Sequence, residues 1–255
     1  MEEECTISRN KRLEDILEML REAQYATVTQ LSKKLYISPS SIRRDLDALE
    51  KRGLVKRTHG GVRLNHTVNP DIPFVNRLKI NTSSKKIMAS KAVALINPGD
   101  VVFVDSSTTC FYLIHEIAKL TDITIITNGI YAAQYLLNYD LDVICTGGKL
   151  DPVERTSMVG PTALETIQGI HADYTFFAPG AIDEKGICYD CWQDINTVCQ
   201  CMLEHSTKKV MLCDSQKIGK TSTFKECTLG DVDILICDIP LEHKYGKLFP
   251  QVEFL

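Results

Sequence analysis

A run of small hydroxyl residues stands directly after the apolar, β-branched stretch 101–104 and before a segment able to form a helix. The run reads Asp105-Ser106-Ser107-Thr108-Thr109. The N-terminus of a helix attracts anions through its free backbone N–H groups, and small side chains leave room for a phosphate there. Hydroxyl groups add further hydrogen-bond donors. The run therefore predicts a phosphate-binding loop.

Four later apolar stretches are also followed by small or polar residues. Stretches 123–126, 141–145, 174–178 and 209–213 lead into Thr127-Asn128-Gly129, Thr146-Gly147-Gly148-Lys149, Pro179-Gly180-Ala181 and Asp214-Ser215-Gln216-Lys217. Each segment alone is more simply a helix cap or a turn. Their recurrence favours a binding site, because ligands of parallel sheets bind beyond the carboxyl ends of the strands.

Within these segments we assign different partners to different side chains. Lys217 is the cation expected to reach a phosphate first, and Lys149 is the second. Asp105 and Asn128 suit sugar hydroxyls, because a carboxylate repels a phosphate but accepts hydrogen bonds from hydroxyls. The predicted ligand-binding residues are Asp105, Ser106, Ser107, Thr108, Thr109, Thr127, Asn128, Gly147, Gly148, Lys149, Gly180 and Lys217.

Four of the ten cysteines stand close together, as Cys188, Cys191, Cys199 and Cys201. Their C-x2-C-x7-C-x-C spacing admits a zinc site or a thiol redox switch. A C-x-C pair on a helix points its two sulfurs in different directions, which favours the absence of a metal. Three other cysteines lie within apolar runs and are expected to be small core residues, Cys145, Cys213 and Cys237.

The first 52 residues contain three segments with helical periodicity. The first, over residues 9–22, places Leu13, Ile16, Leu17 and Leu20 on one face. The second begins near Thr27 or Thr29, and the third begins at Ser38-Pro39, with the serine as N-cap and the proline as first helical residue. Only residues 36 and 37 separate the second helix from this cap, which is the short turn that a helix-turn-helix requires.

The third predicted helix exposes a set of hydroxyl and guanidinium groups at its N-terminal end. In helix-turn-helix modules this end enters the major groove, where such groups contact phosphates and base edges. Two short β-prone pieces around Gly60-Gly61 predict a hairpin wing that follows the DNA backbone. A three-helix domain that packs on another protein is the alternative. The predicted DNA-binding residues are Ser40, Ser41, Arg43 and Arg44 on the helix, and Lys56, Arg57, His59 and Arg63 on the wing.

Charge and composition agree with a small basic module attached to an acidic body. The chain of 255 residues has a net charge of −4, whereas residues 31–64 hold nine Lys or Arg against three acidic residues, a net of +6. The hydrophobic content of 44% is ordinary for a soluble globular protein. The sequence shows no apolar run long enough for a membrane helix and no signal peptide, so we expect a cytoplasmic protein.

The region after residue 101 alternates between apolar strands and segments able to form helices, such as 108–119, 130–138 and 194–206. This alternation predicts an α/β fold with a mostly parallel sheet covered on both faces. Residues 66–76 include two prolines and no periodicity, as expected of a linker. The predicted organisation is a winged helix-turn-helix domain at 1–65, a linker at 66–76 and an α/β domain at 77–255.

Both halves resemble the DeoR family of transcriptional regulators. The N-terminal resemblance rests on Ser38-Pro39-Ser40-Ser41-Ile42-Arg43-Arg44-Asp45-Leu46, Leu49, Gly53 and Arg57-Thr58-His59-Gly60-Gly61. The C-terminal one rests on Pro73-Phe74, Arg77, Asn97-Pro98-Gly99-Asp100, Asp105, Thr108-Thr109, Thr127-Asn128, Gly147-Gly148, Gly160, Gly186, Asp214-Ser215, Lys217 and Gly219. The resemblance covers nearly the whole chain. It implies a sensor domain that is similar to ribose-5-phosphate isomerase and responds to phosphorylated sugars.

Three positions depart from the family's pattern. Ser41 replaces a threonine and keeps its hydroxyl. Ser107 replaces a glycine, so either the loop needs no positive φ or its shape is altered. Cys199 stands where a lysine is expected, which removes one usual anion ligand.

The sequence thus favours a DNA-binding transcriptional repressor controlled by a small phosphorylated metabolite, above all a sugar phosphate, with no cofactor and no membrane partner. A dimer or tetramer is expected, because one module reads only a short half-site. One alternative is a metal- or thiol-responsive regulator that uses the four clustered cysteines. Another is an isomerase-like enzyme using Asp105, Asp214 and Lys217, an account that leaves the DNA-binding module unexplained.

Overall fold

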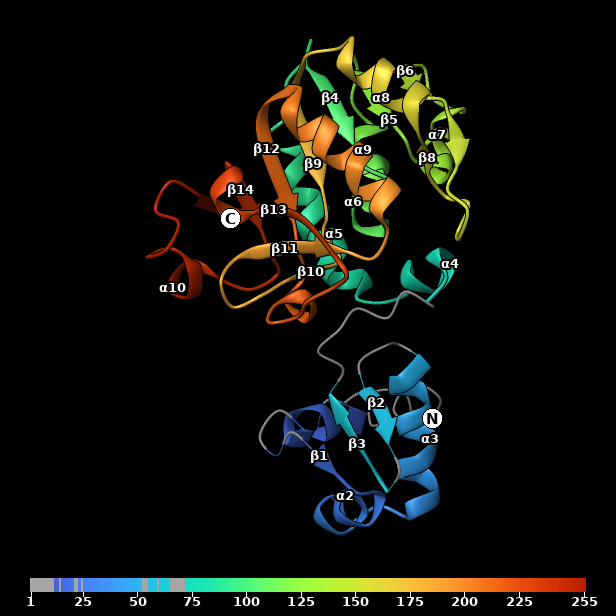
Figure 1. The fold of residues 1–255 in the computed structure, drawn as a ribbon, viewed down its shortest axis with the longest axis vertical. Coiled ribbons are helices and arrows are strands. Elements are labelled where there is room, and N and C mark those ends of the chain that lie inside the picture. The colour runs from blue at the N-terminus through green and yellow to red at the C-terminus, as the bar shows by residue number, and fades with distance from the viewer. Residues whose placement is uncertain are drawn as a thin grey trace. The chain divides into compact units, whose positions relative to one another are not determined.

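The computed structural model of the chain describes residues 12–13, 15–20, 23, 25–51, 55–58, 60–64 and 72–255 (Figure 1). Its contacts divide the chain into two units, Met1–Ile72 and Pro73–Leu255. The division falls within the segment 66–76 that the sequence predicts to be a linker. Each unit is described by itself.

The N-terminal unit is a winged helix-turn-helix. Residues 12–13, 15–20 and 23 are helical and precede α2 (Val28–Leu35) and α3 (Pro39–Lys51). The strands β1 (Tyr25–Ala26), β2 (Val55–Thr58) and β3 (Gly61–Leu64) form an antiparallel sheet in the order β1-β3-β2. Thr27 caps α2 in a capping box with Gln30, and Tyr36 ends that helix in the left-handed region with φ 56°.

Apolar side chains from every element of this unit meet in one core. The predicted helical stripes supply it, since Leu13, Ile16, Leu17, Leu20, Leu31, Ile42, Leu46 and Leu49 are all buried. Val55 and Val62 add the inner face of the wing. The guanidinium of Arg12 pairs with the buried carboxylate of Asp45 at 2.6 Å and 3.0 Å, which ties the first helix to α3.

A seven-stranded parallel sheet forms the centre of the C-terminal unit. Its order is β15-β14-β12-β9-β4-β5-β6. The strands are β4 (Val101–Val104), β5 (Thr124–Thr127), β6 (Asp142–Cys145), β9 (Ala172–Phe177), β12 (Ser206–Leu212), β14 (Ile234–Ile236) and β15 (Glu253–Phe254). Five of them match the apolar stretches named above, β14 lies within a sixth predicted apolar stretch, 232–237, and the two-residue edge strand β15 was not predicted. The parallel α/β architecture is confirmed.

Helices cover both faces of this sheet, as the alternation of core residues along β4 shows. Val102 and Val104 pack with α5 (Thr82–Val93), α6 (Thr108–Ile117) and α7 (Ile130–Leu136). Phe103 faces the opposite way and packs with α8 (Pro161–Gln168) and α9 (Gln193–Glu204). The continuous apolar character of β4 therefore reflects burial on both sides.

A second, antiparallel sheet was not predicted. Its order is β10-β11-β13, made of β10 (Ala181–Ile182), β11 (Ile187–Asp190) and β13 (Phe224–Thr228). The hairpin of β7 (Lys149–Leu150) and β8 (Met158–Val159) is a further small pair. The remaining elements are α4 (Phe74–Arg77), η1 (Ser215–Lys217), η2 (Leu229–Asp231) and α10 (Glu242–Tyr245). Within the described residues, no helix is long and apolar enough to span a bilayer.

The core prediction for the isolated cysteines holds for two of the three. Cys213 and Cys237 are buried, but Cys145 is exposed, so the prediction was wrong for Cys145. The reason is its place at the end of β6, the edge strand of the large sheet, whose two end residues are both exposed.

Candidate functional site

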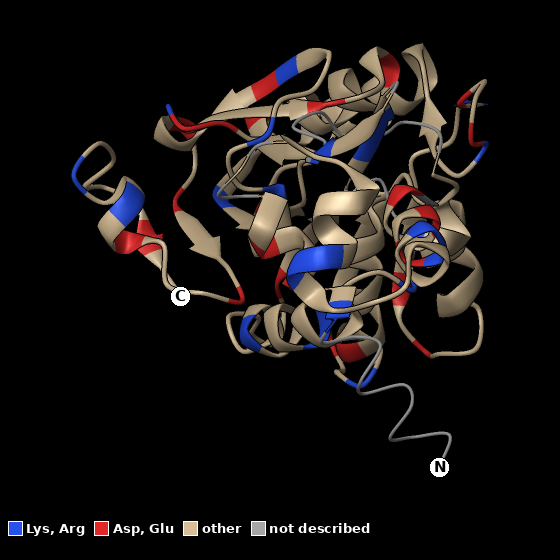
Figure 2. Ribbon diagram, turned by 90° about the horizontal axis from the view of Figure 1, so that it is seen from below, with Lys and Arg blue, Asp and Glu red and all other residues tan. Residues whose placement is uncertain are grey.

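The N-terminal end of α3 presents the predicted DNA-binding side chains. Ser40, Arg43 and Arg44 are exposed, and Ser41 is half-buried. The Ser38 hydroxyl lies 3.0 Å from the hydroxyls of both Ser40 and Ser41 and accepts a 3.3 Å hydrogen bond from the Ser41 N–H. This confirms Ser38 as a cap and gives α3 a cluster of hydroxyls at its positive end. Lys and Arg are blue in Figure 2, which views the same ribbon from below.

The basic residues of the wing are of two kinds, exposed ones and one that forms a salt bridge. Lys56 and Arg63 are exposed and lie directly opposite each other on β2 and β3. Like charges in that position repel each other, and an anionic backbone would relieve the repulsion. Arg57 instead pairs with Asp47 of α3 at 2.6 Å. His59 lies outside the described residues.

The loop after β4 has the conformation of a helix cap. Ser107 has φ −70° and ψ 155° and its hydroxyl accepts from the Cys110 N–H at 3.1 Å. Because φ is negative, serine fits the loop without strain and no glycine is needed. The carboxylate of Asp105 accepts from the N–H groups of Ser107 at 2.9 Å and Ala178 at 2.8 Å. Burial raises the pKa of Asp105, whose oxygens fasten the loop to the end of β9.

A buried cation that sequence reasoning missed stands against this loop. Lys85 of α5 is 3% exposed, and its Nζ donates to the Arg77 carbonyl and to the Thr108 hydroxyl at 3.0 Å. Burial, and then the charge of Lys217, lowers the pKa of Lys85 to about 7. The sequence did contain a signal: Lys85 shares its helical face with the buried Met88, Ala89 and Ala92, where a lysine does not simply solvate.

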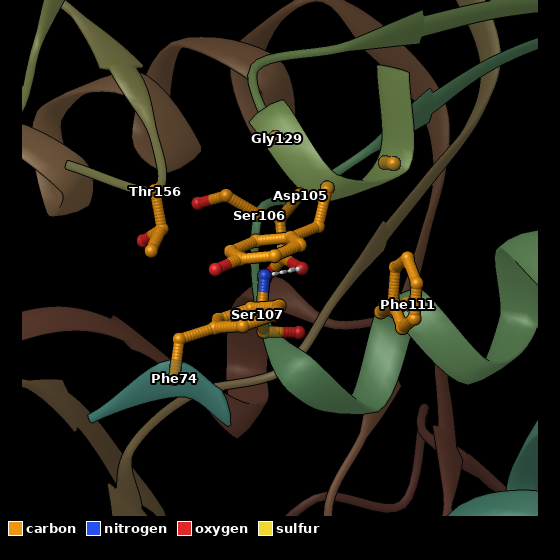
Figure 3. Close-up of a pocket in the computed structure, with 9 residues that line it drawn as sticks. Phe74, Asp105, Ser106, Ser107, Phe111, Gly129 and Thr156 are labelled. Atoms are coloured by element: carbon orange, nitrogen blue, oxygen red, sulfur yellow. Dashed lines mark hydrogen bonds between the residues drawn. The ribbon is translucent and has the colours of Figure 1, made fainter. Parts of the chain in front are cut away.

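A small pocket opens beside the loop (Figure 3). It is lined by Phe74, Asp105, Ser106, Ser107, Phe111, Gly129, Tyr131, Ala132 and Thr156. The rings of Phe74 and Tyr131 are stacked at 4.5 Å with an angle of 5° between them. The hydroxyl of Ser157 donates to that of Ser106 at 2.7 Å, which joins the loop of β4 to the segment before β8. Sequence reasoning did not include these aromatic walls.

Most of the other predicted ligand-binding residues lie at the ends of the strands, whereas Lys149 lies away from the pocket. Lys217 donates to the Pro179 carbonyl at 2.6 Å, beside Gly180. Thr127 is buried and its hydroxyl accepts from the Gly129 N–H at 3.0 Å, whereas Asn128 donates to the Met158 carbonyl at 3.4 Å. Gly147 and Gly148, with φ of 70° and 101°, form the turn into β7. Lys149 is exposed on β7 and does not line the pocket.

Two further buried oxygens at these strand ends have no hydrogen-bond partner within the described part of the chain. They are Thr109 Oγ1 and Asn128 Oδ1. Both accept hydrogen bonds. A ligand rich in hydroxyl donors would satisfy such groups.

The four clustered cysteines do not converge on one point. Cys188 and Cys199 belong to one core cluster and Cys201 to another. Cys191 lies beside the Ser222 hydroxyl, at 3.2 Å. Among the residues that the structure describes, no group of three or more His, Cys, Asp or Glu side chains is arranged to hold a metal ion.

The basic winged helix-turn-helix and the α/β unit with its polar strand ends define a class, the DNA-binding transcriptional regulators that carry a sensor domain. Comparison with known families identifies the two units separately. Residues 12–68 match the DeoR-like helix-turn-helix domain, and residues 80–239 match the DeoR C terminal sensor domain. The chain belongs to the DeoR family.

Curated relatives align along nearly their whole length. The transcriptional regulator GolR of Listeria innocua is 31% identical over 94% of this chain and 94% of its own. The transcriptional repressor GlcR of Bacillus subtilis is 32% identical over 90% and 88%. The L-fucose operon activator of Haemophilus influenzae is 29% identical over 96% and 98%. Among solved structures, ribose 5-phosphate isomerase A of Methanocaldococcus jannaschii matches with 16% identity, a TM-score of 0.41 and 54% and 55% coverage.

Proposed function

We propose that this regulator is a repressor whose effector is a small phosphorylated sugar bound at the strand ends of the sensor domain. Lys85 is the observation that carries the proposal. Its ammonium group is buried against a carbonyl and a hydroxyl, with the loop Ser106–Thr109 beside it. A phosphate would add negative charge to that of Asp214, which already acts on Lys85, and would accept hydrogen bonds from the hydroxyls of that loop.

A second cation lies in electrostatic range. Lys217 lowers the pKa of Lys85, so the two ammonium groups repel each other across the strand ends. An anion held between them relieves that repulsion as well as the desolvation of Lys85. The orphaned acceptors Thr109 Oγ1 and Asn128 Oδ1 suit the sugar hydroxyls.

Thermal-shift measurements on the full chain test the effector. Hexose 6-phosphates and pentose 5-phosphates are compared with the unphosphorylated sugars. At a concentration of about 100 times its dissociation constant, an effector stabilises the fold by about 2.7 kcal/mol, a shift of a few degrees. Thr108→Val and Lys217→Ala should reduce the shift, whereas Lys86→Met, at the exposed neighbour of Lys85, should not. If no phosphorylated sugar produces a thermal shift, the proposed class of effector is refuted.

The regulator acts through DNA, and we propose Arg43 and Arg44 as its base-reading residues. Replacing a base-reading arginine costs about 1–3 kcal/mol and relaxes specificity. A gel-shift series on the region upstream of the chain's own gene measures the effect. A double alanine variant with unchanged affinity would contradict the assignment. Release of this DNA by the effector identified above supports a repressor, and tighter binding contradicts one.

A dimer or tetramer is the oligomeric state that we propose. One winged helix-turn-helix contacts a short half-site, and genomic specificity requires more base contacts than that. Light scattering on the full chain at tens of micromolar should give at least twice the chain mass of 28.6 kDa. A strict monomer would contradict the proposal.

Relatives of this chain carry the names of regulators, and we propose that the sensor domain performs no isomerisation. Asp105, the first of the candidate catalytic acids, has both oxygens occupied by backbone N–H groups. Asp214 accepts from the Asn81 amide and from the Gln216 N–H through one oxygen, Oδ1. The Asp105 carboxylate, with both oxygens engaged by the backbone, is poorly placed to move a substrate proton. Conversion of a sugar phosphate that produces the thermal shift would overturn this view.

A further inference from the structure

One face of the Tyr131 ring, in the pocket beside the loop after β4, is covered by the side chain of Phe74. Figure 3 shows the labelled Phe74 side chain extending from α4 into this pocket. The two ring centroids are 4.5 Å apart and the ring planes differ by 5°, so the rings are in contact and no other group fits between them. Phe111 meets both rings edge-on, at 6.2 Å and 6.5 Å. Phe74 therefore fills the part of the pocket that lies over Tyr131.

The stack stands next to the loop to which we assign the phosphate of the effector. Ser106 and Ser107 line the pocket together with both rings. The sugar ring of a phosphate ester lies within a few bonds of its phosphorus atom, so an ester held by this loop places its ring in the same pocket. Aromatic walls of this kind are usual in small-molecule sites, and the C–H face of a sugar ring packs on them as another apolar ring does. Phe74 thus lies where the sugar ring would lie.

The position of α4, which carries Phe74, depends on its side-chain contacts. It has four residues, fewer than an isolated helix needs to be stable. At its C-terminal end the Arg77 guanidinium forms a bidentate ion pair with Glu154, whose side chain is 8% exposed. At its N-terminal end Pro73 supplies no side-chain cap, and the Phe74 ring is buried in the pocket. Loss of the stack would therefore loosen the N-terminal end of α4 while the ion pair holds the other end.

We propose that Tyr131 is the subsite for the sugar ring of the effector, and that Phe74 occupies this subsite until the bound sugar displaces it. The inference rests on the proposed function and adds a subsite and its regulation to it. It also specifies the ligand, a cyclic sugar phosphate with C–H groups on one face of its ring. Phe74 directly follows Pro73, the first residue of the sensor unit, so its displacement acts on the point where the linker joins that unit.

The direction in which affinity changes when the Phe74 ring is removed distinguishes a competitor from a wall of the site. Calorimetry on the full chain measures the binding of glucose 6-phosphate, galactose 6-phosphate and ribose 5-phosphate. Phe74→Leu keeps an apolar side chain but removes the ring, so at least one ester should bind about two- to tenfold more tightly than to wild type. Phe74→Ala should act in the same direction. Val75→Ala, at an exposed neighbour on α4, should leave the affinity unchanged.

Hydrogen exchange follows α4 itself and needs no variant. The N–H groups of Asn76 and Leu78 donate to the carbonyls of Pro73 and Phe74. These amides should exchange faster in wild type when the ester is bound, and they should already exchange faster in Phe74→Leu without it. Slower exchange of the same amides on binding would mean that α4 closes over the ligand, which would overturn the displacement.

The outcomes separate this inference from the function on which it rests. If an ester binds wild type and binds Phe74→Leu equally or more weakly, Phe74 is not a competitor, and the proposed function stands without the inference. Within Phe74→Leu, Tyr131→Phe should keep the affinity and Tyr131→Ala should lower it; an unchanged affinity in Tyr131→Ala would refute the ring subsite. An ester that binds Phe74→Leu alone supports both proposals. If no ester binds either chain, the effector class fails and the inference fails with it.

Discussion

Replacing Lys85 by methionine should change how the stability of the sensor unit depends on pH. Folded Lys85 has its pKa lowered from 10.5 to about 7, first by burial. Between these two values the unfolded chain binds more protons at this residue than the folded chain does. The free energy of unfolding contributed by Lys85 therefore rises with pH in that window, as the cost of burying the charge disappears.

The size of this effect follows from the two pKa values. Each pH unit between the two pKa values changes the free energy of unfolding by about 1.4 kcal/mol. Near pH 7 folded Lys85 is still partly protonated, so the first pH unit above 7 contributes less than that. Between pH 7 and pH 9 the wild-type chain should gain about 2 kcal/mol of unfolding free energy relative to Lys85→Met. Other buried groups, such as Glu226, titrate in both proteins, so their effects cancel in the difference.

Urea unfolding of wild type and Lys85→Met at pH 7 and pH 9 measures that difference. Lys86→Met is the matched control, because Lys86 neighbours Lys85 on α5 but is exposed, and its difference from wild type should stay constant with pH. A wild-type minus Lys85→Met difference that does not change between the two pH values would refute the reasoning. It would mean that the Lys85 ammonium is hydrated or paired in the folded chain.

Three further predictions concern the loop, a turn and the wing. Gly148→Ala should lower the free energy of unfolding in urea by about 1–3 kcal/mol. The φ of Gly148 is 101°, and a Cβ there would lie 2.5 Å from a carbonyl of β8. Gly169→Ala is the control and should lower it less, because the φ of Gly169 is −80°. Asp105→Asn should lower the melting temperature. The NH2 group of the asparagine would face one of the two backbone N–H groups, of Ser107 or Ala178, that the carboxylate now accepts from. That N–H would lose its hydrogen bond, at a cost of about 1–3 kcal/mol. Lys56→Ala should reduce the slope of log DNA affinity against log salt concentration by about one. Arg57→Ala should reduce it by less, because Arg57 is already paired with Asp47. Equal slopes for the two variants would contradict this prediction.

The regular elements could be predicted because the sequence signals for them are local. A stripe of apolar residues at helical spacing, or an unbroken apolar strand, indicates that the segment is buried, whichever other elements of the fold cover it. Ser38 and Pro39 mark the start of α3 within the residues that form it. The same holds for the loop after β4, whose cap and carboxylate lie within three residues of each other.

The sheet β10-β11-β13 could not be predicted in the same way. Its strands β11 and β13 are four and five residues long, mix polar with apolar side chains, and are separated by the whole of α9 and β12. Their pairing is therefore specified by tertiary contacts and not by a local pattern. The pocket walls Phe74 and Tyr131 were missed for the same reason, since their rings meet only in the folded chain.

The aromatic stack of Phe74 on Tyr131 has a consequence for the energetics of signalling. Phe74 belongs to α4, at the start of the sensor unit, and the chain before it leads to the winged helix-turn-helix. Such a ring pair contributes about 0.5–1.5 kcal/mol beyond the area it buries. A ligand shifts an equilibrium only by its difference in affinity for the two states, so a preference of about tenfold for the unstacked state offsets the stack. If the proposed effector binds in the pocket, a preference of that size is enough to free Phe74, and with it α4, from Tyr131.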